Sequence, residues 1–148
     1  MIKRTVFGVG YNSGGEYRTG ENKKITRCYT VWRGMVERCY NPKKLIRRPN
    51  YVGCSVDERW LDYQSFAEWY YSHKYSGLGY QLDKDVLVQG NKIYSPETCC
   101  FVPREINMLF VSAARARGEF PQGVHYYKPL KKYKAIIRIH GNHEYLGY

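Results

Sequence analysis

Carboxylate and amide side chains gather in the middle of the sequence, between Tyr80 and Asn107. Asp83 and Asp85 interrupt an apolar run over 81–88, a pattern that is typical of a short strand. Oxygen ligands of these two types suit a hard cation such as Mg²⁺, and a water bound to that ion can attack a phosphodiester. The sequence therefore predicts a small site that can hold one Mg²⁺ or Mn²⁺ ion next to a DNA phosphate.

A strand, a loop, a second strand and a helix must position this site. Gly90-Asn91 and Ser95-Pro96-Glu97 are turn signals, and 99–102 is a compact apolar run. Pro103 suits the first position of a helix because its φ is fixed and it has no backbone donor. Apolar residues then recur on one side of that helix, and Asn107 is expected to face back toward the strand. These apolar residues are Ile106, Leu109, Phe110 and Ala113.

The region resembles the HNH nucleases, also called ββα-metal or His-Me finger nucleases, and in particular the phage homing endonucleases among them. The matching segments are LDKD at 82–85, GNKIYSPETC at 90–99 and the helix residue Asn107. The resemblance implies metal-dependent nicking or cleavage of DNA, with Asp83 as the acidic ligand and Asn107 as the ligand from the helix.

Two signature positions depart from the family pattern. Lys84 stands where the general-base histidine is expected, and Thr98 stands where an asparagine that braces the loop is expected. Histidine has a reference pKa of about 6.5, whereas lysine at about 10.4 is protonated near neutral pH. The flanking Asp83 and Asp85 favour the ammonium, so Lys84 is expected to contact a phosphate and Asp85 to be a substitute base. Thr98 and Asn91 are expected to be structural.

The same residues allow a second interpretation, in which the scaffold is kept without its activity. Asp83 and Asp85 would then be solvated strand residues, and Asn107 would be a polar position on the helix. The competing function is a catalytically degenerate HNH-fold protein that binds DNA, as a regulator or an anti-host factor. A purely structural or protein-binding role explains the charge pattern of the chain less well.

The last 26 residues form a second basic region. Turn residues divide it into three predicted strands, at 124–127, 133–139 and 143–146. In the second strand, apolar side chains alternate with Lys134, Ile136 and Arg138, so one face is mostly apolar and the other carries cations. A basic β face fits a DNA groove.

This region resembles the APETALA-type, or ethylene-response-factor, DNA-binding domain, through Gly123-Val124, KYKAII at 132–137 and YLG at 145–147. The resemblance implies that the three-stranded sheet lies in the major groove of double-stranded DNA. In the family a following helix supports the sheet, so here either the nuclease-like core covers the apolar back or the natural chain continues past Tyr148. The predicted DNA contacts are Lys128, Lys131, Lys132, Lys134, Arg138, His140 and His143.

The charge distribution also indicates an acidic partner. The formal net charge is +11. Residues 1–50 hold 12 cations and 3 acids, whereas residues 51–100 hold 4 cations and 7 acids. An acidic centre between basic flanks suits a metal site held between two arms that clamp DNA. The first flank includes a predicted basic loop over 42–50 with four more predicted DNA contacts: Lys43, Lys44, Arg47 and Arg48.

The predicted fold is α+β, with a ββα-metal core between a helical support region and a three-stranded antiparallel ribbon. The support region holds a helix over 29–40 that Asn41-Pro42 ends, and a second helix capped by Asp62 that reaches about Ser72. Trp32, Trp60, Trp69 and Phe66 are predicted to lie in the core. The predicted segments are a basic loop-rich arm (1–28), the support region (29–79), the core (80–117) and the ribbon (118–148).

Hydropathy and cysteine usage favour a cytoplasmic protein, in the host bacterium if a phage encodes it. No apolar run approaches the roughly 20 residues that a membrane span requires, and no signal-peptide segment follows the first four residues. The five cysteines include no CxxC pair, so reduced thiols are expected. Their spacings match no common zinc pattern, and zinc is not expected. Whether the chain forms a homodimer is left open.

Overall fold

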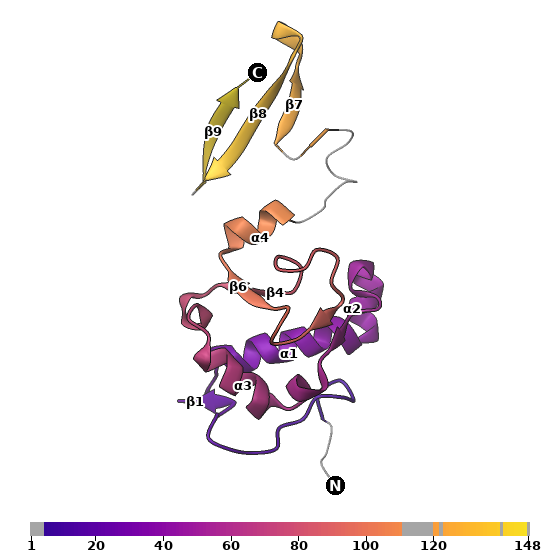
Figure 1. The fold of residues 1–148 in the computed structure, drawn as a ribbon, viewed down its shortest axis with the longest axis vertical. Coiled ribbons are helices and arrows are strands. Elements are labelled where there is room, and N and C mark those ends of the chain that lie inside the picture. The colour runs from indigo at the N-terminus through magenta and orange to yellow at the C-terminus, as the bar shows by residue number, and fades with distance from the viewer. Residues whose placement is uncertain (1–4, 111–119, 122, 140, 148) are drawn as a thin grey trace. The chain divides into compact units, whose positions relative to one another are not determined.

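The computed structural model describes residues 5–110, 120–121, 123–139 and 141–147 (Figure 1). The chain divides into two compact units, Met1–Pro103 and Arg104–Tyr148. Helices and sheets are both present, which confirms the predicted α+β class. The division differs from the four predicted segments because residues of the arm, of the support region and of the strands in the predicted core share one hydrophobic core.

Helix α1 spans Arg27–Tyr40 and begins slightly earlier than predicted. Thr26 caps it, because the hydroxyl of Thr26 accepts a hydrogen bond from the backbone N–H of Tyr29 at 3.2 Å. The helix ends at Asn41, since a residue that precedes proline disfavours helical backbone angles. One side of α1 is buried and consists of Cys28, Val31, Trp32, Met35, Val36 and Cys39.

The segment after α1 is helical rather than the predicted basic loop. Helix α2 spans Pro42–Arg47, and the side chain of Asn41 accepts a hydrogen bond from the N–H of Lys43 at 3.1 Å. A capping asparagine followed by proline is a helix start signal, and here it outweighs the run of cations. The ammonium of Lys44 lies 3.7 Å from the carboxylate of Glu37. The other predicted DNA contacts of this segment are exposed: Lys43, Arg47 and Arg48.

Helix α3 spans Tyr63–Ser72, and Asp62 caps it as predicted, with a 3.1 Å hydrogen bond from the N–H of Gln64. Its buried side packs against α1 through aromatic side chains. The indole N–H of Trp32 donates a 2.7 Å hydrogen bond to the carbonyl of Trp60, and both rings are fully buried. The predicted core role of these tryptophans and of Phe66 is confirmed, and Trp69 packs partly buried at the edge.

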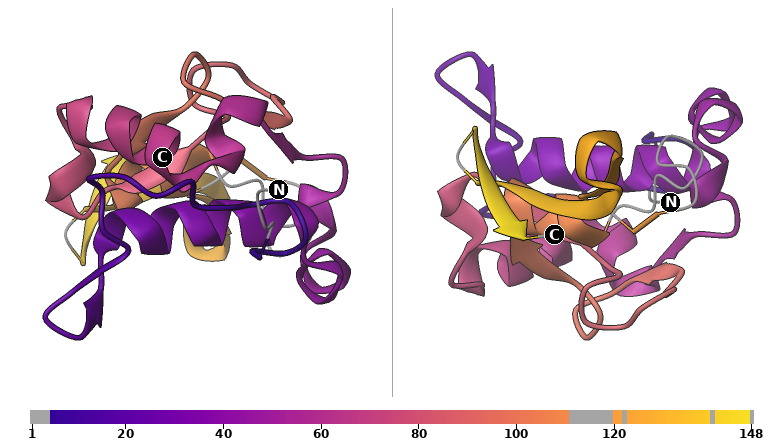
Figure 2. Two further views of the ribbon diagram at one scale, coloured as in Figure 1. Left: turned by 90° about the horizontal axis from the view of Figure 1, so that it is seen from below. Right: turned by 90° about the horizontal axis from the view of Figure 1, so that it is seen from above.

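The N-terminal segment packs against this core (indigo in Figure 2) rather than extending as an arm. The backbone N–H of Tyr11 donates to the carbonyl of Leu61, and the carbonyl of Tyr11 accepts from the N–H of Tyr63, both at 2.9 Å. A Cβ atom at Gly10 would lie 3.1 Å from the ring of Trp32. Only glycine allows the backbone to approach the indole this closely without displacing it.

Short strands complete the first unit. The antiparallel pair β4 and β6 carries the predicted site, and β4 ends at Asp83 rather than continuing to Val88. The strand pairs are β1 (Gly20–Glu21) with β2 (Lys24–Ile25), β3 (Ser55–Val56) with β5 (Ile93–Tyr94), and β4 (Gln81–Asp83) with β6 (Cys100–Val102). Short 3₁₀ helices connect these elements at Pro49–Tyr51, Glu58–Leu61 and Ser76–Leu78.

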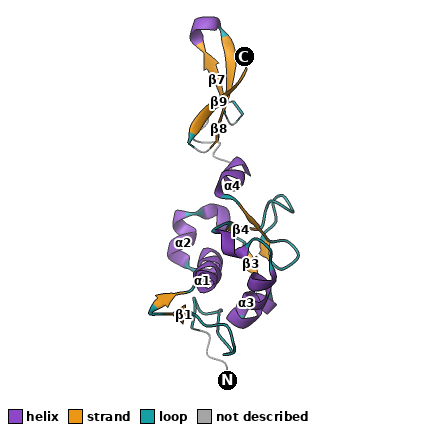
Figure 3. Ribbon diagram, turned by 90° about the vertical axis from the view of Figure 1, so that its left-hand side faces the viewer, coloured by secondary structure: helices purple, strands orange, loops and turns teal. Residues whose placement is uncertain are grey.

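The second unit contains helix α4 (Arg104–Phe110), which directly follows Pro103, and a three-stranded antiparallel sheet (Figure 3). The predicted strands are confirmed and differ by no more than one residue at either end. They are β7 (Val124–Tyr127), β8 (Lys132–Ile139) and β9 (Asn142–Gly147), with a 3₁₀ turn at Lys128–Leu130 between the first two. Among the described residues, no helix is both long enough and apolar enough to cross a membrane.

Candidate functional site

Asp83 ends strand β4 by turning the chain. Its Oδ1 atom accepts hydrogen bonds from the backbone N–H groups of Asp85 at 2.6 Å and of Val86 at 2.8 Å. An aspartate side chain that bonds the backbone two and three residues later replaces strand pairing with a turn. This local competition explains why the apolar residues after Asp85 do not extend the strand.

Lys84 is buried, and its ammonium is fully engaged by the loop that follows β4. Its Nζ atom donates to both carboxylate oxygens of Asp85, at 2.8 and 2.7 Å, and to the carbonyl of Asn91 at 2.6 Å. It also lies 5.8 Å from the centroid of the Tyr94 ring. The predicted contact between Lys84 and a phosphate does not match this geometry, because the ammonium faces Asp85 and the loop backbone. Asp85 is correspondingly the ion-pair partner of Lys84.

Asn91 and Thr98 hold the backbone of this loop. The amide nitrogen of Asn91 donates to the carbonyls of Lys84 at 2.9 Å and Ile93 at 2.6 Å. The hydroxyl of Thr98 donates to the same Ile93 carbonyl at 2.9 Å and lies 3.0 Å from the hydroxyl of Ser95. Together with Lys84, these side chains hold residues 83–98 as a closed loop through hydrogen bonds to the loop's own backbone carbonyls.

The predicted metal ligands lie in different units, Asp83 in the first and Asn107, on α4, in the second. Their sharing of one ion stays a prediction. Across the part of the chain that the structure describes, no group of three or more His, Cys, Asp or Glu side chains is placed to hold a metal ion.

Arg59 joins the 3₁₀ helix Glu58–Leu61 to the C-terminal end of this loop. Its guanidinium makes two 2.9 Å hydrogen bonds to the carboxylate of Glu97 and bonds Asp57 at 2.8 and 2.9 Å. The hydrogen bonds from Arg59 lower the pKa of Glu97 to about 2 and also lower the pKa of Asp57. Sequence reasoning missed this pairing, because residues 59 and 97 are 38 positions apart and no local pattern links them.

The lowered pKa of Glu97 predicts a loss of stability in acid. The folded-state pKa lies below the ordinary value of 4.5, so the contribution is fully present above pH 4.5 and is lost as the pH falls toward 2. We expect Glu97→Gln to be modestly less stable than the parent at pH 6, and the difference to disappear near pH 2. Urea unfolding at several pH values measures this. The matched control is Glu58→Gln, which removes a carboxylate from the 3₁₀ helix that carries Arg59.

The register of the C-terminal sheet sorts its side chains onto two faces. Residues directly opposite one another in antiparallel strands project to the same side, and side chains alternate along each strand. The paired residues place Val124, Tyr126, Tyr133, Ala135 and Ile137 on one side. The opposite side, here called the cationic face, consists of His125, Tyr127, Lys132, Lys134, Ile136, Arg138, His143 and Tyr145.

Lys134 occupies the middle of the cationic face. Its ammonium lies 5.6 Å from the ring centroid of Tyr127 on β7 and 5.5 Å from that of Tyr145 on β9, so a ring from each outer strand flanks it. Attraction between a cation and the face of an aromatic ring orders the side chain without using its N–H donors. Those donors therefore remain suited to an external acceptor.

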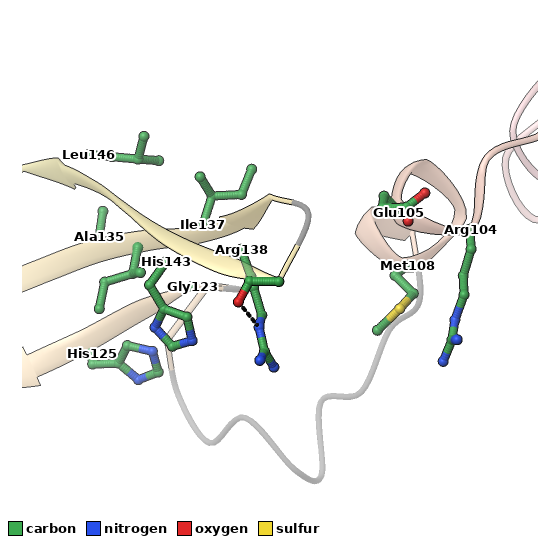
Figure 4. Close-up of a pocket in the computed structure, with 12 residues that line it drawn as sticks. Arg104, Glu105, Met108, Gly123, His125, Ala135, Ile137, Arg138, His143 and Leu146 are labelled. Atoms are coloured by element: carbon green, nitrogen blue, oxygen red, sulfur yellow. Dashed lines mark hydrogen bonds between the residues drawn. The ribbon is translucent and has the colours of Figure 1, made fainter.

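Arg138 and His143 extend the cationic face toward the β8–β9 turn, whereas His125 lies opposite Lys134. Figure 4 shows His125, Arg138 and His143 on one side of the ribbon and Ile137 and Leu146 on the other, around a pocket that all five help to line. The Nε atom of Arg138 donates to the carbonyl of Gly141 at 3.1 Å.

The other predicted contacts of the ribbon lie at its two turns. Lys128 and Lys131 are exposed on the β7–β8 connection, where Lys131 has a left-handed backbone with φ 48°. His140 lies outside the described residues. The exposed cations of this connection directly precede Lys132, the first residue of β8, so the positive charge continues from the strand onto the turn.

The cysteines belong to the core of the first unit. Burial raises the pKa of the thiols of Cys28, Cys39 and Cys99 to about 12. These thiols are therefore protonated at neutral pH. Their role in the structure is to pack against the aromatic side chains of α1 and α3.

Comparison of the chain with protein-family models, with curated proteins and with solved structures finds no match.

Proposed function

We propose that the protein binds double-stranded DNA through the cationic face of its C-terminal sheet. The observation that carries the proposal is the strand register, which places Lys132, Lys134, Arg138 and two histidines on one side of three strands. The major groove of DNA is about 12 Å wide and admits a two-stranded ribbon. Neighbouring strands lie about 4.8 Å apart, so two strands can enter the groove while the third lies along its edge.

The side chains of this face have two kinds of recognition chemistry. Ammonium groups such as that of Lys134 neutralise phosphates without regard to sequence. Arg138 and His143 lie opposite each other and carry directional donors. An arginine can bond both acceptors on the major-groove edge of guanine, and such a contact distinguishes one base pair from another. We therefore infer that the lysines raise the affinity for DNA by contacting phosphates, and that Arg138 and His143 recognise bases.

A triple substitution tests this interface. Lys132→Ala, Lys134→Ala and Arg138→Ala together are expected to weaken binding to a short duplex at least about tenfold and to lower the slope of log affinity against log salt by about 2 to 3. Fluorescence anisotropy at several salt concentrations measures both quantities. The matched control removes three exposed cations of the first unit, Arg18, Lys24 and Lys74. Equal losses in the two triple variants would show that only net charge matters and would remove the ribbon from the proposal.

A second candidate function is metal-dependent nicking or cleavage of DNA, as in the HNH nucleases. The order β4, loop, β6 and α4 supports it, with Asp83 as the last residue of the first strand. The turn bonds involve Oδ1 of Asp83, so Oδ2 would coordinate one Mg²⁺ or Mn²⁺ ion, with Asn107 as a further ligand. That ion would supply a Lewis acid for phosphoryl oxygens. The paired ammonium of Lys84 at the position of the general base favours a catalytically degenerate DNA-binding regulator or anti-host factor instead.

Cleavage is tested by incubating supercoiled plasmid with the protein and Mg²⁺ or Mn²⁺. Asp83→Asn is the informative variant, because its amide oxygen can still accept the two backbone hydrogen bonds of the turn while the charge is removed. Metal-dependent relaxation by the parent that is lost in Asp83→Asn would establish the nuclease. A parent that shifts the plasmid in a gel and leaves it intact would establish binding without cleavage.

A further inference from the structure

Arg38 stands in the last turn of α1 with its guanidinium beside two tyrosine rings. Its Cζ atom lies 5.9 Å from the ring centroid of Tyr51 and 5.5 Å from that of Tyr94. Tyr51 belongs to a 3₁₀ helix and Tyr94 to β5, so three separate elements fix the guanidinium. A guanidinium that packs on aromatic faces has its plane set in advance, and its N–H donors point away from the rings.

The Nε–H donor of Arg38 is not satisfied by the part of the chain that the structure describes. Its Nε atom is buried and has no hydrogen-bond partner, and no described carboxylate forms an ion pair with it. The neighbouring cation at the Tyr94 ring, Lys84, is by contrast bonded to Asp85 and Asn91. A buried N–H that lacks an acceptor is rare in proteins, since it has given up water without replacement.

We propose that Arg38 is a phosphate-binding residue whose ligand is a phosphodiester group of a nucleic-acid backbone. A phosphate presents two oxygens to the edge of a guanidinium, and the planar N–H groups of arginine match that arrangement. The following helix α2 exposes Lys43 and Arg47, and this concentration of positive charge favours a polyanion over an isolated carboxylate. The inference rests on the proposed DNA binding and gives the first unit a phosphate contact of its own.

Two substitutions separate this role from a structural one. Arg38→Gln removes the charge, and Arg38→Lys keeps the charge but not the planar pair of donors. Arg33→Gln is the matched control, because Arg33 lies on the same helix, is exposed and packs on a single ring, that of Phe7, at 5.6 Å. Urea unfolding of each variant establishes that it is folded before binding is measured.

The first measurement follows the Nε–H signal of Arg38 by nitrogen-15 NMR, assigned by its loss in Arg38→Lys. We expect the signal to shift when inorganic phosphate is added and to shift further with a short DNA duplex. The second measurement is duplex affinity against salt concentration. Arg38→Gln is expected to bind about fivefold or more weakly than Arg33→Gln, with a salt slope reduced by about 1, and Arg38→Lys is expected to fall between Arg38→Gln and the parent.

The outcomes distinguish this inference from the proposed function. If the parent binds duplex DNA, but Arg38→Gln matches Arg33→Gln and the signal does not move, the Arg38 site is overturned and DNA binding stands. If the parent does not bind duplex DNA while phosphate still shifts the signal, the proposed function fails and an oxyanion site remains. A signal that moves with phosphate and not with the duplex overturns the assignment of the ligand to nucleic acid.

Discussion

Replacing Trp32 with alanine is expected to lower the free energy of unfolding by about 3 to 5 kcal/mol, the range for truncating a fully buried tryptophan. The ring is completely buried between α1 and α3, against Tyr29 and Tyr63. Its removal creates a cavity in the hydrophobic core of the first unit and leaves the carbonyl of Trp60 without its 2.7 Å donor. Urea unfolding followed by circular dichroism measures the change.

The conservative variant Trp32→Phe separates the two contributions. Phenylalanine keeps most of the ring volume and loses the indole N–H, so we expect a smaller loss of about 1 to 3 kcal/mol, the cost of an unsatisfied buried acceptor. Trp69→Ala is a further control, because Trp69 is only partly buried. An unfolding midpoint of Trp32→Ala equal to that of Trp69→Ala would contradict the central position assigned to Trp32.

Lys84→Ala is expected to cost about 2 to 3 kcal/mol of stability, an unusually large effect for the loss of a lysine. The ammonium is buried and donates to Asp85 and to the carbonyl of Asn91, and its loss leaves that carbonyl without its donor and the loop of residues 83–98 without its closure. We keep the estimate below the full cost of breaking a buried ion pair, because the carboxylate of Asp85 is 42% exposed and can turn to water.

Lys84→Met and Lys92→Ala are the matched variants for this prediction. Methionine keeps most of the volume and removes the charge, so the difference between the methionine and alanine variants measures packing. Lys92 lies on the same loop and donates one 3.0 Å hydrogen bond to the carbonyl of Asn50 from an exposed position. Its loss is expected to change stability by less than about 0.5 kcal/mol. If Lys84→Ala is as stable as Lys92→Ala, the loop does not depend on the buried ammonium.

Elements with local signals were predictable from the sequence. The apolar spacing of α1, the cap of α3 at Asp62 and the turn residues of the ribbon each lie within a short window, and the structure has these elements where they were predicted. The alternation along β8 was likewise enough to separate cations from apolar residues. The charges after Asn41 predict a loop, whereas the Asn41 cap and Pro42 in fact start helix α2.

Contacts between distant residues were not predictable in the same way. The sequence places Lys84 beside two aspartates, but its burial depends on Asn91 and on the Tyr94 ring, and these contacts form only when the loop closes. No local sequence pattern predicts the contact of Arg59 with Glu97 or the packing of Arg38 on Tyr94, because each partner comes from a distant part of the chain. Tertiary structure decides which cation is neutralised internally and which can bind a ligand. Lys84 is neutralised by Asp85, whereas Arg38 is the proposed ligand-binding cation.

The docking of the N-terminal segment constrains the order in which the chain can fold during synthesis. The N–H of Ser13 donates to the carboxylate of Asp62, which leaves the ribosome 49 residues later, and Tyr11 bonds to the backbone on either side of that aspartate. The segment around Tyr11 must therefore wait without a docking surface until the start of α3 has emerged. The close approach of Gly10 to the Trp32 ring is therefore expected to form only after that surface exists.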